Sequence, residues 1–402
     1  MNTAAPVPFE TLSARAFSPT APIDAKALFA GRLPQLSSLI KAVSQKGQHA
    51  IVYGERGVGK TSLVNVVSRF MSLSDALVVR INCTSADNFG QVWKKVFEEF
   101  DLEISMADGF VSEIGPKITT AVEKMLASDM SPEAVRRGLT MVSRLVKTIV
   151  IIDEFDTLSE AAKKEMADAV KSLSDHAVDA TVILVGIADS VIQLISEHES
   201  VERALVQIHM PRMSGEETLE ILTKGMQIVG MTIEEDAADQ VVKLSKGLPH
   251  YAHLLGLNAI ESSHRENKLV VDGRSVEQAI SAALSGAQQS VRNLWHTATN
   301  SPRPDNLFEE VLIACALAKT DELGYFAAQD VKDPLTKILK RPIKNANYSR
   351  HLIEFCDFAK GPVFERFGEE RKYRYRFRNP LLQPYAVMQG YSQKLLQRTG
   401  RK

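Results

Sequence analysis

Short apolar runs alternate with helical periodicity over the first half of the chain. Strands are predicted at 50–53, 76–82, 148–152, 181–187 and 206–209, and the run Thr148-Ile149-Val150-Ile151-Ile152 is apolar throughout. A continuous apolar run of this kind is typical of a parallel strand that is buried on both faces. An amphipathic helix is predicted from Leu28 to Ser44. Strands that alternate with helices predict an α/β fold with a parallel sheet.

After residue 213 the strand pattern stops. Ser214 and Glu217 have the spacing of a capping box, and helical periodicity then continues to about residue 289. We therefore expect an all-helical domain over 214–289. Residues 290–304 include Ser301-Pro302-Arg303-Pro304 and are interpreted as a linker. Residues 1–27 contain four prolines and many small residues, so a flexible, poorly ordered arm is expected there.

The C-terminal part, 305–397, has a different order of elements. Helical patterns at 308–317, 330–341 and 347–358 precede two strand patterns at 361–367 and 372–377. Three helices followed by a hairpin is the order of a winged-helix domain, which is expected for 305–397.

Composition narrows the class of protein. The 402 residues are 45% hydrophobic and 24% charged, as in an ordinary soluble protein of two or three domains. Three widely spaced cysteines argue against a disulfide framework, and no secretory signal or long apolar segment is evident, so a cytoplasmic protein without a membrane partner is expected. The net charge of −1 combines +7 over 336–378 with −8 elsewhere, which indicates an anionic partner for the C-terminal part.

The motif G-x-x-x-x-G-K-T occupies residues 54–61, between a predicted strand and a predicted helix. This is the phosphate-binding loop of nucleotide triphosphatases: its backbone N–H groups surround phosphates, its lysine reaches the β- and γ-phosphates, and its threonine ligates Mg²⁺. The alternative, a glycine-rich turn, rarely has this strand and helix on either side. The residues expected to bind ATP are Gly54, Glu55, Arg56, Gly57, Val58, Gly59, Lys60, Thr61 and Ser62.

Two acidic residues, Asp153 and Glu154, end the apolar run 148–152. A carboxylate at the end of such a strand can hold Mg²⁺, and the next one can polarise an attacking water. We therefore predict Asp153 as a metal ligand together with Thr61, and Glu154 as a catalytic residue with Lys60. The alternative is a helix N-cap followed by a solvated neighbour.

Together, the loop at 54–61 and Ile151-Ile152-Asp153-Glu154-Phe155-Asp156-Thr157-Leu158 resemble the Walker A and B boxes of AAA+ ATPases. The D-E-x-D-x-L form is similar to that of origin-recognition-complex-like initiators, and Leu28–Arg32 resembles the adenine-side entry of the superfamily, which adds Arg32 to the binding residues. The resemblance spans about 28–390. It implies an ATPase core over 28–213, a helical lid over 214–289, and ATP and Mg²⁺ as cofactors.

The resemblance implies further site residues. Asp189 lies where the family places a polar sensor, although the family usually has Asn, Ser or Thr there, and an N-cap is the alternative. Arg203 matches the position of the arginine finger that completes a neighbouring subunit's site, with Arg212 as a second candidate and an exposed helix-end arginine as the alternative. The segment Gly247-Leu248-Pro249-His250 resembles the G-L-P motif of STAND signalling ATPases, in which the proline turn and the next residue approach the nucleotide.

Basic residues alternate with aromatic ones in the last predicted strand. One face carries the positive charges and the other carries Tyr373, Tyr375 and Phe377. Basic residues in the preceding helices add to that face, which can meet the phosphates of duplex DNA, with a solvated face or an acidic protein as the alternatives. The candidate DNA contacts are Lys340, Arg341, Arg350, Lys372, Arg374, Arg376 and Arg378.

Three functions are consistent with these features. The first is an ATP-hydrolysing AAA+ switch that binds duplex DNA and assembles into an oligomer through its arginine finger. The second is a STAND-like signalling or defence ATPase whose winged helix contacts a protein partner. The third is an ATPase regulator of a transposase or nuclease.

Overall fold

The computed structural model describes residues 7–19, 31–74, 76–106, 130–187, 199–302, 306–369 and 372–396, together with Thr120, Val122 and Lys124. The chain divides into two compact units. We call Pro22–Gly54 with Gly59–Met210 the sheet unit, and Met1–Ala21, Glu55–Val58 and Pro211–Lys402 the helical unit. Each unit is described by itself.

Five strands and six α-helices of the sheet unit are described, with one 3-10 turn. In chain order they are α2 (Leu33–Ser44), β1 (His49–Tyr53), α3 (Lys60–Ser72), β2 (Leu77–Asn82), α4 (Phe89–Met106), α6 (Pro132–Val142), β3 (Thr148–Asp153), η1 (Phe155–Thr157), α7 (Glu160–Asp175), β4 (Ala180–Gly186), α9 (Glu199–Glu202) and β5 (Leu205–His209).

The five strands form one parallel sheet in the order β2-β3-β4-β1-β5. Every residue of β3 and of β4 is buried, as the apolar runs predict for strands that are covered on both faces. All five predicted strands, and with them the predicted α/β class, are confirmed. The order places the C-terminal ends of β1 and β3 at the same edge of the sheet, which is where parallel α/β folds bind their ligands.

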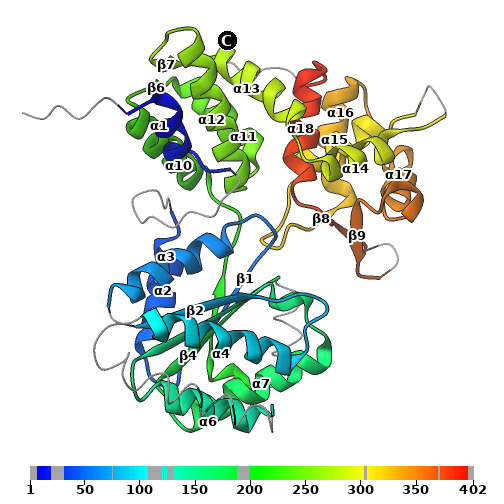
Figure 1. The fold of residues 1–402 in the computed structure, drawn as a ribbon. Helices are drawn as coiled ribbons and strands as arrows, with labels where there is room; N and C mark the ends of the chain where they lie inside the picture. The colour runs from blue at the N-terminus through cyan, green and yellow to red at the C-terminus, as the bar shows by residue number, and fades with distance from the viewer. Residues whose placement is uncertain are drawn as a thin grey trace, which may run out of the picture. The chain divides into compact units, whose positions relative to one another are not determined.

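Helices cover both faces of this sheet (Figure 1). Residues of α4, α6 and α7 form one apolar cluster with one face of the strands, and Trp93, Phe97 and Phe100 of α4 are its large members. Figure 1 shows α2 and α3 on the other face. The predicted helix 28–44 begins later than expected: α2 starts at Leu33, after Gly31 and Arg32, which both have positive φ.

The lid part of the helical unit is helical with one small exception. It comprises α10 (Gly215–Val229), β6 (Thr232–Ile233), α11 (Glu235–Ser245), α12 (Pro249–Arg265), β7 (Val270–Val271) and α13 (Gly273–Ser285). The predicted capping box is present, with Ser214 and Glu217 bonded reciprocally at the start of α10. The prediction of an all-helical domain missed the short parallel pairing of β6 with β7.

The prediction of a poorly ordered arm is wrong for residues 9–19. Helix α1 (Phe9–Ala16) packs on α10 and α12, and Phe17 after it is only 1% exposed. The Phe17 ring fills the space above two helical glycines: an added Cβ would lie 2.2 Å from the ring at Gly225 and 2.5 Å from it at Gly256. We call residues 9–19 the strap. Its few apolar residues are enough to hold it on the lid, because α10 and α12 leave room for the Phe17 ring at Gly225 and Gly256.

The predicted linker 290–304 is also corrected, because α14 occupies Gln289–Thr299. Val291, Trp295 and Ala298 recur at helical spacing and are buried. We call the part of the chain from α14 to α18 the C-terminal module. Its other elements are α15 (Phe308–Leu317), β8 (Phe326–Ala327), η2 (Ala328–Val331), α16 (Lys332–Leu339), η3 (Asn345–Asn347), α17 (Ser349–Glu354), η4 (Phe358–Lys360), β9 (Phe364–Phe367), β10 (Arg374–Phe377) and α18 (Leu382–Ser392).

The strands of this module form an antiparallel sheet in the order β8-β10-β9. Its buried face is aromatic, with Phe326 and Phe364 in edge contact at 5.4 Å and Tyr375 and Phe377 packed beside them. The three predicted helices and the predicted hairpin are present, whereas β8 and α18 were not predicted. A two-residue strand is too short to give a pattern, and α18 follows Pro380 without a capping residue.

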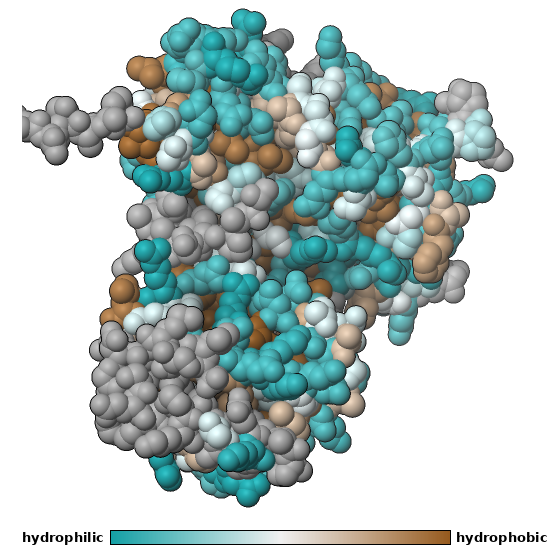
Figure 2. Space-filling model, in the orientation of Figure 1, coloured by the Kyte–Doolittle hydropathy of each residue, from teal (hydrophilic) through white to brown (hydrophobic). Residues whose placement is uncertain are grey.

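Polar residues cover most of the described surface in the view of Figure 2, with smaller apolar areas among them. None of the helices within the described residues is both long and apolar enough to cross a bilayer. The most exposed large apolar side chains include Phe358 at 91% and Phe367 at 68%, both in the C-terminal module.

Candidate functional site

The loop of the G-x-x-x-x-G-K-T motif leaves β1 at a close approach. The Met210 N–H donates to the Tyr53 carbonyl at 2.7 Å, and a Cβ added at Gly54 would lie 2.3 Å from the Met210 carbonyl oxygen. Only glycine fits there. Gly57 and Gly59 have φ values of 86° and 98°, in the left-handed region that favours glycine. The sequence motif therefore corresponds to a tight turn that needs these glycines.

Helix α3 begins at Lys60, directly after this loop. Its N-cap residue is Gly59, which contributes no side chain to cap the helix. The positive end of the α3 dipole and the first N–H groups of the helix therefore suit an anion such as a phosphate. The Lys60 ammonium donates to the Gly54 carbonyl at 2.9 Å, so the loop's own backbone holds the positive charge beside the turn.

Asp153 links the second motif to the first. Its side chain is buried at the end of β3, and its Oδ1 accepts the Glu154 N–H at 2.9 Å. Its Oδ2 accepts a hydrogen bond from Thr61 Oγ1 at 3.0 Å, across 92 positions of sequence. The structure thus brings the two predicted metal ligands into direct contact.

The same carboxylate also binds an arginine that the sequence analysis missed. Arg80 lies in the middle of β2, and its Nη2 donates to Asp153 Oδ2 at 2.8 Å. Its Nη1 donates to Asn65 Oδ1 of α3 at 2.6 Å. The available signal was a single charged residue inside the Val-rich strand 77–82, because a charge there needs a partner in the fold.

Glu154 is exposed and adopts a left-handed backbone conformation, with φ of 56°. This conformation is uncommon for a residue with a Cβ and directs the chain into η1. The next acid in the motif, Asp156, has a structural contact: its Oδ1 accepts the Ile187 N–H at 3.1 Å and so ties the end of β4 to η1. Of the acids in this motif, Glu154 is therefore the one left in solvent.

The donor set fits a magnesium ion. A threonine hydroxyl and a carboxylate 3.0 Å apart are hard oxygen ligands, and Mg²⁺ commonly takes one or two such ligands and completes its shell with water and phosphate oxygens. The Arg80 guanidinium already pairs with Asp153, which shows that the buried carboxylate is placed where a positive charge can meet it.

The other predicted residues of the sheet unit lie in different surroundings. Arg203 is exposed between α9 and β5, as a residue that reaches a neighbouring molecule must be. Arg32 is 2% exposed. Asp189 lies outside the described residues.

Arg212, the second candidate for the arginine finger, lies in a hydrogen-bond network of the helical unit. Its Nε donates to Glu55 Oε2 at 2.6 Å, and its Nη1 donates to Gln383 Oε1 of α18 at 2.6 Å and to the Lys246 carbonyl at 3.3 Å. Burial and the nearby Arg212 charge lower the pKa of Lys246 to about 8. The side chain of Arg212 is 16% exposed and committed within its own chain, which does not suit a finger.

The strap binds the start of α12, where the Gly-Leu-Pro-His segment lies. Pro249 is in the first turn of α12, and His250 Nδ1 lies 2.7 Å from the Pro19 carbonyl, to which it must donate because that oxygen only accepts. The Ser18 N–H donates to His253 Nδ1 at 3.3 Å, and burial lowers the pKa of His253 to about 4. His250, which the resemblance to the G-L-P motif places near the nucleotide, is therefore a contact of the strap.

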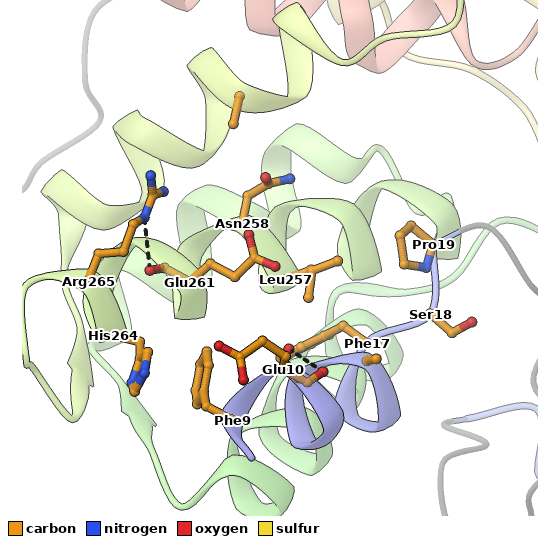
Figure 3. Close-up of a pocket in the computed structure, with 13 residues that line it drawn as sticks. Phe9, Glu10, Phe17, Ser18, Pro19, Leu257, Asn258, Glu261, His264 and Arg265 are labelled. Carbon is orange, nitrogen blue, oxygen red and sulfur yellow. Dashed lines mark hydrogen bonds between the residues drawn. The ribbon is translucent and has the colours of Figure 1, made fainter.

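A cavity of about 780 Å³ lies between the strap and the lid. Figure 3 shows Phe9, Glu10 and Phe17 of the strap on one side and residues of α12 on the other, with Phe9 stacked on His264 at 3.7 Å between ring centroids. None of its lining residues belongs to the two nucleotide motifs. The cavity is a feature of the strap and not of the nucleotide site.

The predicted basic face of the hairpin is smaller than the alternation suggests. Arg376 is 8% exposed, bonds Glu365 at 2.6 Å and lies 4.6 Å from the Tyr325 ring centroid, so it is a structural residue rather than a DNA contact. Arg374 pairs with Asp321 at 2.7 Å. The alternation was correct for one strand, but Asp321 and Tyr325 before β8 and Glu365 of β9 contact the two arginines, and the sequence did not reveal these contacts.

The remaining basic candidates lie on the surface of the C-terminal module. Arg350 is exposed but pairs with Glu354 at 2.5 Å, and Arg378 is exposed with a 3.4 Å bond to the Phe364 carbonyl. Lys340, Arg341 and Lys372 are exposed and have neither an acidic partner nor a side-chain hydrogen bond among the described residues.

Comparison with known proteins gives a family match for part of the chain. Residues 43–194 match the model of an AAA domain, a range that includes both nucleotide motifs. No curated protein matches the sequence.

Solved structures resemble the chain over most of its length. A Walker-type ATPase of Pyrococcus abyssi is 17% identical, with a TM-score of 0.51 over 91% of this chain and 98% of that one. The ORC2 protein of Aeropyrum pernix, solved as ADPNP and ADP complexes, is 14% identical with a TM-score of 0.48 over 94% and 98%. The ORC1 protein of Aeropyrum pernix in complex with DNA is 15% identical with a TM-score of 0.47 over 91% and 94%. The first match shows a shared fold.

Proposed function

We propose that this chain binds and hydrolyses Mg·ATP and uses the nucleotide state to control its contact with duplex DNA. The observation that carries the ATPase part is the 3.0 Å hydrogen bond between Thr61 Oγ1 and Asp153 Oδ2. It joins a phosphate-loop hydroxyl to a buried strand-end carboxylate, and P-loop nucleotide triphosphatases hold their metal ion with these two groups.

In this proposal the phosphate loop and α3 bind the phosphates. Lys60 would exchange the Gly54 carbonyl for oxygens of the β- and γ-phosphates, and Thr61 with Asp153 would hold Mg²⁺. When bound, the ion neutralises charge on the terminal phosphate. For Arg32, Pro249 and His250 a role in nucleotide binding rests on the family resemblance alone.

Glu154 would orient and polarise the attacking water. Its exposure leaves the carboxylate available, and phosphoryl transfer requires positioning and charge compensation more than covalent chemistry. The exposed Arg203 would complete the site of a neighbouring subunit in an oligomer, and Asp189 would sense the terminal phosphate. Both of these roles are proposals from the resemblance.

The direct test is ATP hydrolysis by the purified chain and by Lys60→Ala. Loss of the loop ammonium should abolish nucleotide binding, because no other described lysine lies on this loop. Exposed Lys164→Ala of α7 is the matched control and should behave as the wild type. Unchanged turnover in Lys60→Ala would refute the ATPase assignment.

The DNA part of the proposal rests on the C-terminal module. Its order α15-β8-α16-α17-β9-β10, with the sheet order β8-β10-β9, supports the proposal that this module is a winged helix. Lys340, Arg341 and Lys372 are exposed basic residues that could bind phosphates. Changing all three to Ala should weaken binding and reduce the slope of log affinity against log salt by about 2 to 3.

A matched triple variant controls for net charge. Lys41, Lys46 and Lys164 are exposed residues of the sheet unit, and their change to Ala alters the charge by the same amount. If both triple variants weaken DNA binding equally, the contact is a general charge effect and the winged helix has no special role.

One observation favours the STAND-like alternative. Arg212 bonds both Glu55 of the phosphate loop and Gln383 of α18, so the C-terminal module contacts the loop within one compact unit. A module linked to the loop by these bonds could change conformation with the bound nucleotide and so alter its contact with a protein partner. An ATPase rate that duplex DNA does not change at low salt, with no retention of DNA, would favour this alternative.

A further inference from the structure

Arg80 occupies the carboxylate that the proposed function assigns to magnesium. Its Nη2 lies 2.8 Å from Asp153 Oδ2, and the side chains are 29% and 7% exposed. Asp153 Oδ2 also accepts from Thr61. The arginine, the hydroxyl and the carboxylate thus meet at one oxygen atom.

The surroundings of Arg80 leave its guanidinium charge partly buried, which costs free energy unless an anion such as Asp153 pairs with it. β2 is an edge strand of the sheet, and Arg80 extends from it toward Asn65 of α3. Its Nε is buried and has no hydrogen-bond partner among the described residues. Arginine cannot lose its proton to relieve this, so the guanidinium keeps a full charge and one unsatisfied donor.

A metal ion and this guanidinium compete for Asp153. Both are positive, and at ligand distances from one carboxylate oxygen they repel each other strongly. Binding of Mg²⁺ to Asp153 therefore requires Arg80 to withdraw. Asn65, whose Oδ1 accepts from Nη1 at 2.6 Å, is a second anchor that can keep the withdrawn side chain near the phosphates.

Resting on the proposed function, we propose that Arg80 is a positioning residue that stands in for the metal. It holds Asp153 beside Thr61 when no cation is bound, and it releases the carboxylate when Mg·nucleotide arrives. While paired, it also neutralises Asp153, so that a triphosphate without metal does not meet a bare carboxylate. Arg80 therefore sets how strongly nucleotide affinity depends on Mg²⁺.

The test measures ATPγS affinity by titration calorimetry, with excess MgCl₂ and with excess EDTA. In Arg80→Gln we expect affinity within about threefold of the wild type with Mg²⁺, and a loss of about tenfold or more in EDTA. Arg80→Lys should retain part of the EDTA affinity because it keeps the charge. Exposed Arg144→Gln in the same unit is the matched control and should leave both affinities unchanged.

A double variant isolates the pair. In the Asp153→Asn background, Arg80→Gln should cause little further loss in EDTA, because no carboxylate is left to neutralise. A merely structural role for Arg80 would lower affinity equally with and without metal, and would persist in that background.

The outcomes separate this proposal from the one on which it rests. If the wild type binds no ATPγS even with Mg²⁺, the proposed function fails. If the wild type binds and Arg80→Gln changes both affinities by the same factor, the inference about Arg80 is overturned and the proposed function stands.

A measurement on the wild type covers the case in which Arg80 variants do not fold. In the NMR spectrum, the Arg80 Nε–H resonance of the ATPγS complex in EDTA should shift when Mg²⁺ is added in excess over the EDTA, because the guanidinium leaves Asp153. An unchanged resonance would overturn the inference.

Discussion

The effect of Gly256→Ala on the stability of the lid should change sign when Phe17 is replaced by Ala. Gly256 lies inside α12 and Gly225 inside α10, where glycine costs about 1 kcal/mol relative to alanine. The structure gives a reason for both: Phe17 of the strap lies against them, and an added Cβ at Gly256 would be 2.5 Å from the ring. Gly256→Ala should therefore destabilise the lid when Phe17 is present and stabilise it when Phe17 is Ala.

The magnitudes follow from packing. Phe17 is 1% exposed, and truncation of a buried phenylalanine to alanine costs about 3–5 kcal/mol. An extra methyl group in a filled space costs about 1–3 kcal/mol, which exceeds the gain in helix propensity. With the ring removed, the methyl group enters open space and the propensity gain of about 1 kcal/mol remains. Because the propensity gain is the same in both backgrounds, the coupling between the two sites should equal the overpacking cost, about 1–3 kcal/mol.

The assay is native-state hydrogen exchange of the α10 and α12 amides in the wild type, both single variants and the double variant. Exchange reports the local free energy of opening, which matters because two compact units need not unfold together. Exposed Phe70→Ala in α3 is the control for loss of a phenylalanine. Additive effects, or equal protection in all four proteins, would refute the account of the strap.

Other predictions concern catalysis and buried titratable groups. Glu154→Gln should bind ATP with little turnover, and normal turnover would exclude its assigned role. Burial lowers the pKa values of His49 and His253 to about 4. Their contribution to the free energy of unfolding is therefore complete above about pH 6.5 and is lost as the pH falls toward 4, by about 3 kcal/mol for each. Urea unfolding at several pH values would measure this loss. Burial raises the pKa of Cys83 to about 12 and that of Cys315 well above its usual value, so both should resist alkylation in the native protein and react after unfolding, as mass spectrometry would show.

The sequence was sufficient for features that depend on local pattern. The strands of the sheet have apolar runs long enough to identify, and the loop at 54–61 needs glycine for backbone reasons that are the same in any fold. Thr61 and Asp153 were both predicted as metal ligands from the two motifs, and the structure brings them into contact. In these cases each residue's role is determined by neighbours close in sequence or by sheet order.

Features that depend on distant partners could not be predicted. The strap looked disordered because its single large buried residue, Phe17, packs on glycines more than 200 positions away. The basic face of β10 lost Arg376 because Glu365 and Tyr325 lie beside it in the folded sheet. Arg80 was missed because a lone arginine in a strand has no motif, although its contact with Asp153 is among the most informative in the structure.

The charges near the two motifs allow one more prediction. In the sheet unit, Lys60 and Arg80 balance Asp153 and Glu154, so these four side chains together carry no net charge before a ligand binds. We therefore expect the attraction for a triphosphate at the two motifs to come mainly from the N-terminus of α3 and the loop N–H groups, which act at short range. Nucleotide association should therefore depend only weakly on salt, whereas DNA binding should weaken steeply. Stopped-flow association of a fluorescent ATP analogue at low and moderate salt would test this, and a steep fall in the association rate would show that long-range charge, not the local geometry of the loop, draws the nucleotide in.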